Sequence, residues 1–243
     1  MAKPLHSRLH CPHLKDFCRT LSALPGHRNI RDHYCDFLEA SLASLHSVSL
    51  KLAGRDPTPM DRAYAGVRQR AGAAVMQAYA QMFSHLASSL EARPRDAFGE
   101  LFGALDLGVG EAGQFYTPFE VSQFLVQANL TDIESVIAEK GFFTVAEPAV
   151  GAGGMLIAVR NEMVARGLSP HRQCLAVGVD IDRRAVAMAY IQTTLLGLAT
   201  VVVHGDALKL DLQAEYPNIF AQKFVTRGFD TRDALGGLTR PGG

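Results

Sequence analysis

The stretch FTVAEPAVGAGG, residues 143–154, is an apolar run that leads through Glu-Pro-Ala into a turn rich in glycine. Two further apolar runs follow it: CLAVGVDID over residues 174–182 and TVVVHGDAL over residues 200–208. Each run is short, apolar and followed by acidic or glycine residues, which is typical of a buried parallel strand. We predict strands over residues 143–146, 174–182 and 200–208.

The segments that join these runs, residues 155–166 and 183–196, are predicted to be helices. Alternating strands and helices are typical of a doubly wound α/β fold, whose ligands bind beyond the carboxyl ends of the parallel strands. The sequence therefore predicts a nucleotide-binding core, with its ligand at the turn that follows the first strand.

The residues at the predicted strand ends suit a ligand that contains a nucleoside. Gly151 and Gly153 have no Cβ, so the backbone of the turn can approach a ligand closely. Asp180 follows that turn by about thirty residues and is placed to accept hydrogen bonds from a ribose diol. Asp206 is suited to accept from an exocyclic amine, and the backbone of Ala207 to read the edge of the ring. A glycine turn alone is a weak signal, and three suitable strand ends in order strengthen it.

A second segment, GQFYTP at residues 113–118, precedes an apolar helix predicted over residues 119–126. Thr117 suits the cap of that helix and Pro118 its first position. Together with EPAVGAGG, GVDID and HGDAL, in this order, the segment resembles the N6-adenine DNA methyltransferases of the type I modification-subunit group. The resemblance covers about residues 95–208.

The resemblance implies an α/β fold: a Rossmann-like methyltransferase core with a partial sheet, preceded by an all-helical N-terminal region. In the family, the GQFxTP segment closes over S-adenosylmethionine and the glycine loop holds its methionine part. The acid after the second strand takes the ribose, and the acid of GDxL takes the adenine. The cofactor-binding residues implied here are Phe115, Thr117, Pro118, Glu147, Pro148, Ala149, Gly151, Gly153, Asp180, Ile181, Asp206 and Ala207.

One element of the family is missing from the sequence. The family's fourth strand ends in Asn-Pro-Pro-Phe or Asn-Pro-Pro-Tyr, whose Asn accepts from the target amine while the ring stacks on the flipped base. Residues 209–243 contain no such run, and the nearest fragment, Tyr216-Pro217-Asn218, has the wrong order and one proline. No catalytic residue is assigned.

Three parts are expected: a helical region over residues 1–112, the cofactor-binding core over 113–212, and an irregular tail over 213–243, with at most a short helix. Apolar spacing predicts N-terminal helices over residues 13–24, 30–50, 62–90 and 96–107. In the resembled family this region contacts partner subunits or DNA; the alternative is a lid or scaffold for the cofactor pocket. The first strand's outer edge needs a cover: the N-terminal helices, the tail, a partner or another copy.

Composition narrows the class of protein. The formal net charge is zero, but the first 80 residues hold 11 Lys and Arg against 6 Asp and Glu, which fits a nucleic-acid-facing half or simply a solvated helical surface. No signal-peptide or membrane-spanning pattern is present, so we expect a cytoplasmic protein without membrane contact and with reduced thiols. A run of His and Cys between His6 and Cys35 contains no CxxC pair, which favours ordinary helix residues over a zinc site.

Three interpretations of function follow. The chain is an adenine-specific DNA methyltransferase by descent, from a restriction-modification system, whose acceptor site would come from another chain. Alternatively, it is a catalytically dead S-adenosylmethionine-binding or regulatory module. The third interpretation is a truncated or degenerate fragment, which the four intact cofactor motifs disfavour.

Overall fold

The computed structural model describes residues 9–25, 28–105 and 117–239, and its core is a four-stranded sheet. The strands are β1 (Phe143–Glu147), β2 (Cys174–Asp180), β3 (Thr200–Asp206) and β4 (Asp211–Pro217), in that spatial order. The first three are parallel, and β4 runs antiparallel to β3. The three predicted strands are confirmed, with β2 and β3 each ending two residues before the predicted limit.

Helices cover both faces of the sheet, and the side chains of its central strands alternate between them. Ala176 and Val202 point into a cluster with side chains of α8 (Gly154–Ala165) and α10 (Arg183–Leu195). Val177 and Val201, one residue away on each strand, belong to a second cluster on the other face. The predicted α/β architecture is therefore present, with both faces of β2 buried.

The C-terminal segment differs from the irregular tail that we predicted. It begins within β4 and continues into α11 (Gln222–Val225) and α12 (Thr231–Thr239). Phe224 and Leu235 from these helices complete the second apolar cluster. In the part of the chain that is described, no strand pairs with the outer edge of β1, and α12 and α7 (Ile133–Lys140) lie against that strand.

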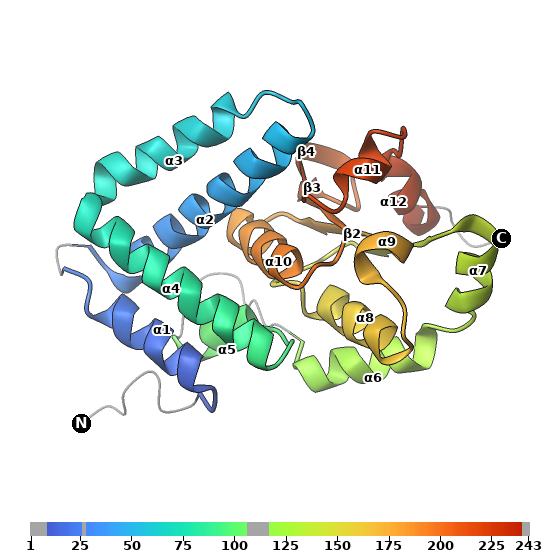
Figure 1. Ribbon diagram of the computed structural model, residues 1–243, viewed down its shortest axis with the longest axis horizontal. Coiled ribbons are helices and arrows are strands. Elements are labelled where there is room, and N and C mark those ends of the chain that lie inside the picture. Colours follow the sequence, from blue (N-terminus) through green and yellow to red (C-terminus); the bar gives the residue numbers. More distant parts are fainter. Residues whose placement is uncertain (1–8, 26–27, 106–116, 240–243) are drawn as a thin grey trace.

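Within the described residues, the N-terminal region consists of five helices. They lie to one side of the sheet in Figure 1. They are α1 (Pro12–Ser22), α2 (Ile30–Leu52), α3 (Thr58–Ala71), α4 (Ala73–Ala92) and α5 (Ala97–Ala104). The single helix predicted over residues 62–90 is wrong, because the chain breaks into α3 and α4 at Gly72. That residue has φ +81° and ψ 163°, a conformation that favours glycine over other residues.

The helix α2 fastens this region to the sheet. Its Ser49 hydroxyl donates to the carbonyl of Pro217 at the end of β4, at 2.8 Å. Its Tyr34 hydroxyl donates to Met188 Sδ on α10, at 3.1 Å. On the far side of the core, α6 (Phe119–Asn129) packs on α8, and the short α9 (Pro170–Gln173) leads into β2. Within the described ranges, we find no helix with the length and apolar character to cross a membrane.

A buried histidine on α2 makes the stability of this junction depend on pH. His46 packs edge-on against the rings of Tyr190 and Tyr216, and its Nδ1 lies 3.2 Å from the Tyr190 hydroxyl. Burial, with a contribution from the charge of Arg55, lowers the pKa of His46 to about 4. Because the unfolded chain binds this proton near pH 6.5, the neutral form stabilises the fold at higher pH, and that stabilisation is lost as the pH falls towards 4.

Replacing His46 by Gln should remove this titration, since Gln cannot take up a proton but retains polar atoms for Tyr190. Between pH 7 and pH 5, wild type should lose about 2 kcal/mol more of unfolding free energy than His46→Gln. Urea denaturation of both proteins at the two pH values measures the difference. If the two proteins lose the same unfolding free energy between pH 7 and pH 5, the lowered pKa of His46 is not the cause of the pH dependence.

Candidate functional site

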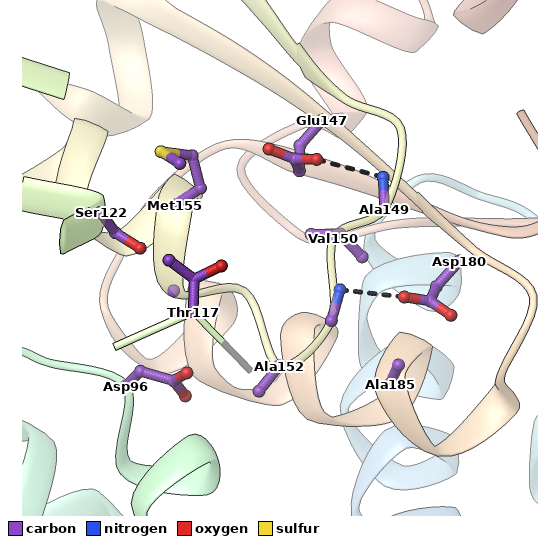
Figure 2. Close-up of a pocket in the computed structure, with 12 residues that line it drawn as sticks. Asp96, Thr117, Ser122, Glu147, Ala149, Val150, Ala152, Met155, Asp180 and Ala185 are labelled. Atoms are coloured by element: carbon purple, nitrogen blue, oxygen red, sulfur yellow. Dashed lines mark hydrogen bonds between the residues drawn. The ribbon is translucent and has the colours of Figure 1, made fainter. Parts of the chain in front are cut away.

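A cavity of about 390 Å³ lies at the carboxyl ends of β1 and β2 (Figure 2). This is the end of the sheet at which doubly wound folds bind their ligands. Residues from the N-terminal helices, from the start of α6 and from the sheet all contribute to its wall. The lining residues are Asp96, Thr117, Ser122, Glu147, Ala149, Val150, Gly151, Ala152, Gly154, Met155, Asp180 and Ala185.

The glycine turn between β1 and α8 forms the floor of the cavity. The amide of Val150 donates to the carbonyl of Val179 at 2.8 Å, which holds the turn against β2. Gly151 and Gly153 have φ +54° and +100°. A Cβ on Gly153 would lie 3.2 Å from the Cα of Ala189, so a glycine lets this turn approach α10.

Asp180 is held at the end of β2 by two backbone amides. Its Oδ2 accepts from Gly151 at 2.9 Å, and its Oδ1 accepts from Asp182 at 2.9 Å. Each oxygen of a carboxylate has two lone pairs, so both keep one acceptor position for a diol. Asp182 caps α10 by accepting from the amide of Arg184.

Glu147 enters the cavity from the end of β1. Its Oε1 accepts from the amide of Ala149 at 3.1 Å, and Figure 2 shows the carboxylate turned over the glycine turn. The pKa of Glu147 is raised above its ordinary value, mainly by burial. The hydrogen bond from Ala149 lowers the pKa in part, and the negative charge of Asp180 raises it further. A cation at this position would favour the ionised form.

The third strand end lies outside the cavity wall. Asp206 accepts from the amides of Leu208 and Lys209, at 3.0 and 3.1 Å, and pairs with the Lys209 ammonium at 3.0 Å. Those contacts lower the pKa of Asp206, and the hydrogen bond from the Lys209 side chain has the largest effect. Nearby, two apolar side chains face solvent: Ile181 is 71% exposed and Leu208 is 90% exposed. Leu208 had not been predicted to belong to the site, although its position two residues after Asp206 is visible in the sequence.

The structure brings together only some of the predicted site residues. Thr117, Glu147, Ala149, Gly151 and Asp180 line the cavity. Pro118, Pro148, Gly153, Ile181, Asp206 and Ala207 are not part of its lining. Phe115 lies outside the described residues.

The helix α6 begins at the residue predicted for it, but the predicted cap is wrong. The helix begins at Phe119, so Pro118 takes the cap position, and the Thr117 side chain makes no capping bond. Thr117 lines the cavity, and Figure 2 shows its side chain next to Ser122, on the same side of the cavity as Asp96.

Two polar residues that sequence analysis did not assign to the site hold its walls together. Asp96, at the cap of α5, lines the cavity and is 5% exposed. Gln192, on α10, is completely buried. Its Nε2 donates to Asp96 Oδ1 at 2.9 Å and to the carbonyl of Ala152 at 2.7 Å. Its Oε1 accepts from the amides of Ala97 and Phe98, at 2.8 and 3.2 Å.

The fragment Tyr216-Pro217-Asn218 is remote from the cavity. Asn218 is fully buried at the start of β3, where its side chain accepts from the amide of Thr200 and donates to the carbonyl of Leu198. This is the end of the sheet opposite the cavity, so Asn218 has a structural role. His204 is paired with Asp180 in the sheet, and its Nε2 lies 3.2 Å from the carbonyl oxygen of Ile181.

No group of three or more His, Cys, Asp or Glu side chains is arranged to hold a metal ion in the described part of the chain. His6, one of the residues in the N-terminal run of His and Cys, lies outside that part. Burial raises the pKa of the Cys18 thiol to about 11, which keeps that side chain protonated and apolar in character.

Three parallel strands with helices on both faces, and a glycine turn after the first strand, are typical of a Rossmann-like core. A model of the protein family described as N-6 DNA Methylase matches residues 101–224, about half of the chain. The chain belongs to the N-6 DNA Methylase family. The matched range begins within α5 and ends within α11, so it includes the whole sheet and every residue of the cavity lining except Asp96.

Among solved structures, the chain is similar to one provisionally described as a class I S-adenosylmethionine-dependent methyltransferase from Listeria monocytogenes. The two are 16% identical, with a TM-score of 0.37, and the alignment covers 73% of this chain. It covers 54% of the Listeria chain, so this chain spans about half of that length. A TM-score this low supports no inference. A search of curated proteins finds no match.

Gln192 should be essential for the stability of the site. Replacing it by Leu leaves the buried amide of Phe98 and the carbonyl of Ala152 without a partner, which should cost about 2–5 kcal/mol of unfolding free energy. Chemical denaturation measures the loss. The matched control is Gln81→Leu on the exposed face of α4, which should change stability by less than about 0.5 kcal/mol. Equal effects from the two substitutions would refute the role given to Gln192.

Proposed function

We propose that this chain binds S-adenosylmethionine in the cavity beyond β1 and β2, as the cofactor-binding part of an adenine-specific (N6) DNA methyltransferase. The observation that carries the proposal is the charge of the cavity. Among the described residues, its lining includes the carboxylates of Asp96, Glu147 and Asp180 and no Lys, Arg or His. S-adenosylmethionine carries an ammonium and a sulfonium against one carboxylate, and a partly buried acidic cavity favours a cationic ligand. The family match supports the same cofactor.

The residues present fit the parts of this cofactor in order along the strand ends. The ribose diol is assigned to Asp180, whose oxygens are held by backbone amides and keep free acceptor positions. The methionine part is assigned to Glu147 and the glycine turn. The adenine is assigned to the region of Ile181, Asp206 and Ala207, where its ring would cover the exposed Ile181 and Leu208 side chains.

The chemistry assigned to this chain is binding and orientation. When bound, S-adenosylmethionine supplies an activated methyl group. Transfer of a methyl group to an amine depends mainly on alignment of the two reactants. The hydrogen bonds that fix Asp180 and Glu147 provide such alignment on the cofactor side.

The acceptor side requires residues that the printed sequence does not contain. It has no Asn-Pro-Pro-aromatic run, and Asn218 is buried at the opposite end of the sheet. We therefore propose that another chain holds the target adenine, with DNA as the substrate and a partner subunit as part of the active assembly. The second candidate is a catalytically dead, S-adenosylmethionine-binding or regulatory module, which the burial of Asn218 favours for this chain alone. If the first proposal holds, the chain would act in the cytoplasm as part of a restriction-modification system.

Replacing Asp180 by Asn should weaken S-adenosylmethionine binding about tenfold or more, because the uncharged amide retains only one acceptor oxygen for the amides and the diol. Calorimetric titration measures the dissociation constant. The matched control is Asp16→Asn on the exposed surface of α1, which should bind as wild type does. Unchanged affinity in a folded Asp180→Asn protein would refute the ribose assignment, and a folded wild type that binds nothing would refute the proposal.

Methyl transfer distinguishes the two candidates. The assay follows labelled methyl groups from S-adenosylmethionine into unmethylated DNA, with the chain alone and with candidate partner chains added. The first proposal predicts label on adenine N6 only when a partner that carries an acceptor site is present. Cofactor binding without transfer in every combination would favour the binding module.

A further inference from the structure

The cavity receives one of its carboxylates from the N-terminal helices, and the strand-end pattern does not account for it. Asp96 precedes α5 and is almost completely buried, yet it lines the cavity. Its Oδ1 accepts two hydrogen bonds, from the amide of Gly99 at 2.8 Å and from Gln192 Nε2 at 2.9 Å. Its Oδ2 has no hydrogen-bond partner among the described residues.

The free oxygen faces the place where a ligand would sit. A Cβ built on Gly154 would lie 3.2 Å from Asp96 Oδ2, so this oxygen is next to the first turn of α8. Figure 2 shows the Asp96 carboxylate on the side of the cavity that Thr117 occupies, and away from Asp180. The ligand part that reaches Asp96 is therefore not the ribose assigned to Asp180.

The chemistry of the site specifies what that ligand part must be. A buried carboxylate oxygen without a cationic or hydrogen-bonding partner is costly, and no basic side chain is among the described residues that line the cavity. An ammonium group supplies both a positive charge and three donors, whereas a sulfonium supplies charge without a donor. The Asp96 oxygen thus matches an ammonium better than any other group of the proposed cofactor.

We infer that Asp96 binds the α-ammonium of the methionine part of the cofactor, so that the helical region supplies a binding residue to the cofactor site. The inference rests on the proposed function and adds a residue and a specificity to it. Gln192 is the positioning residue: it fixes Asp96 Oδ1 and leaves Oδ2 directed at the ligand. A bound cofactor would then connect α5 to the glycine turn and to β2.

The test compares two ligands that differ in the amino group. S-adenosylhomocysteine has the ammonium, and its deaminated analogue retains the carboxylate, the thioether and the adenosine. Wild type should bind S-adenosylhomocysteine about tenfold or more tightly than the analogue. Asp96→Asn should lose most of this preference while its affinity for the analogue stays within about twofold. A change of fold alone would weaken both ligands equally, so the ratio of the two dissociation constants is the readout.

A second variant tests whether an effect of Asp96→Asn comes only from the loss of the cap on α5. In Asp96→Ser, the hydroxyl can still cap the amide of Gly99, but it leaves no carboxylate in the cavity. It should lose the preference in the same way as Asp96→Asn, and Asp16→Asn should retain it. Calorimetric titrations at one pH and salt concentration give all the constants.

Other outcomes would overturn the inference. If both ligands weaken equally in the Asp96 variants, or if the preference survives, Asp96 has only a structural role. If the preference is lost in Glu147→Gln but not in the Asp96 variants, the ammonium belongs to Glu147. A wild type that binds both ligands equally refutes the inference and leaves the proposed function standing, whereas a folded wild type that binds neither ligand refutes both.

Discussion

The site depends on the hydrogen bonds of the Gln192 side-chain amide. It is completely buried, and its four hydrogen bonds reach Asp96, the first amides of α5 and the carbonyl of Ala152 in the glycine turn. Both donors and the acceptor oxygen of the amide are therefore in use. One residue of the sheet-covering helix α10 thus positions the turn that forms the cavity floor and the start of the helix that closes its side.

The described residues that line the cavity carry an excess of negative charge, and this charge suits the cationic ligand proposed for it. Three carboxylates line the cavity without a basic side chain. Burial raises the pKa of Asp96, against the lowering effect of its bonds from Gln192 and Gly99. A cationic ligand would relieve that cost, and its binding would also join the helical region to the sheet. Binding of the proposed cofactor would therefore stabilise this junction.

The sequence predicted the three parallel strands and the turn because buried strands and glycine turns leave local patterns. The fourth strand was missed because DLQAEYP is polar and half-exposed, and its position depends on pairing with β3. The break at Gly72 was missed because neighbouring alanines favour helix on both sides. Asp96 and Gln192 are 96 residues apart, so their contact has no local signature.

The most direct measurement of the central claim is a crystal structure of the chain grown with S-adenosylmethionine. We expect density for the methionine part between Asp96 and Glu147, for the ribose at Asp180, and for the adenine beside Ile181 and Leu208. Density for the cofactor at another surface, or an unchanged cavity at a concentration that saturates binding in solution, would contradict it.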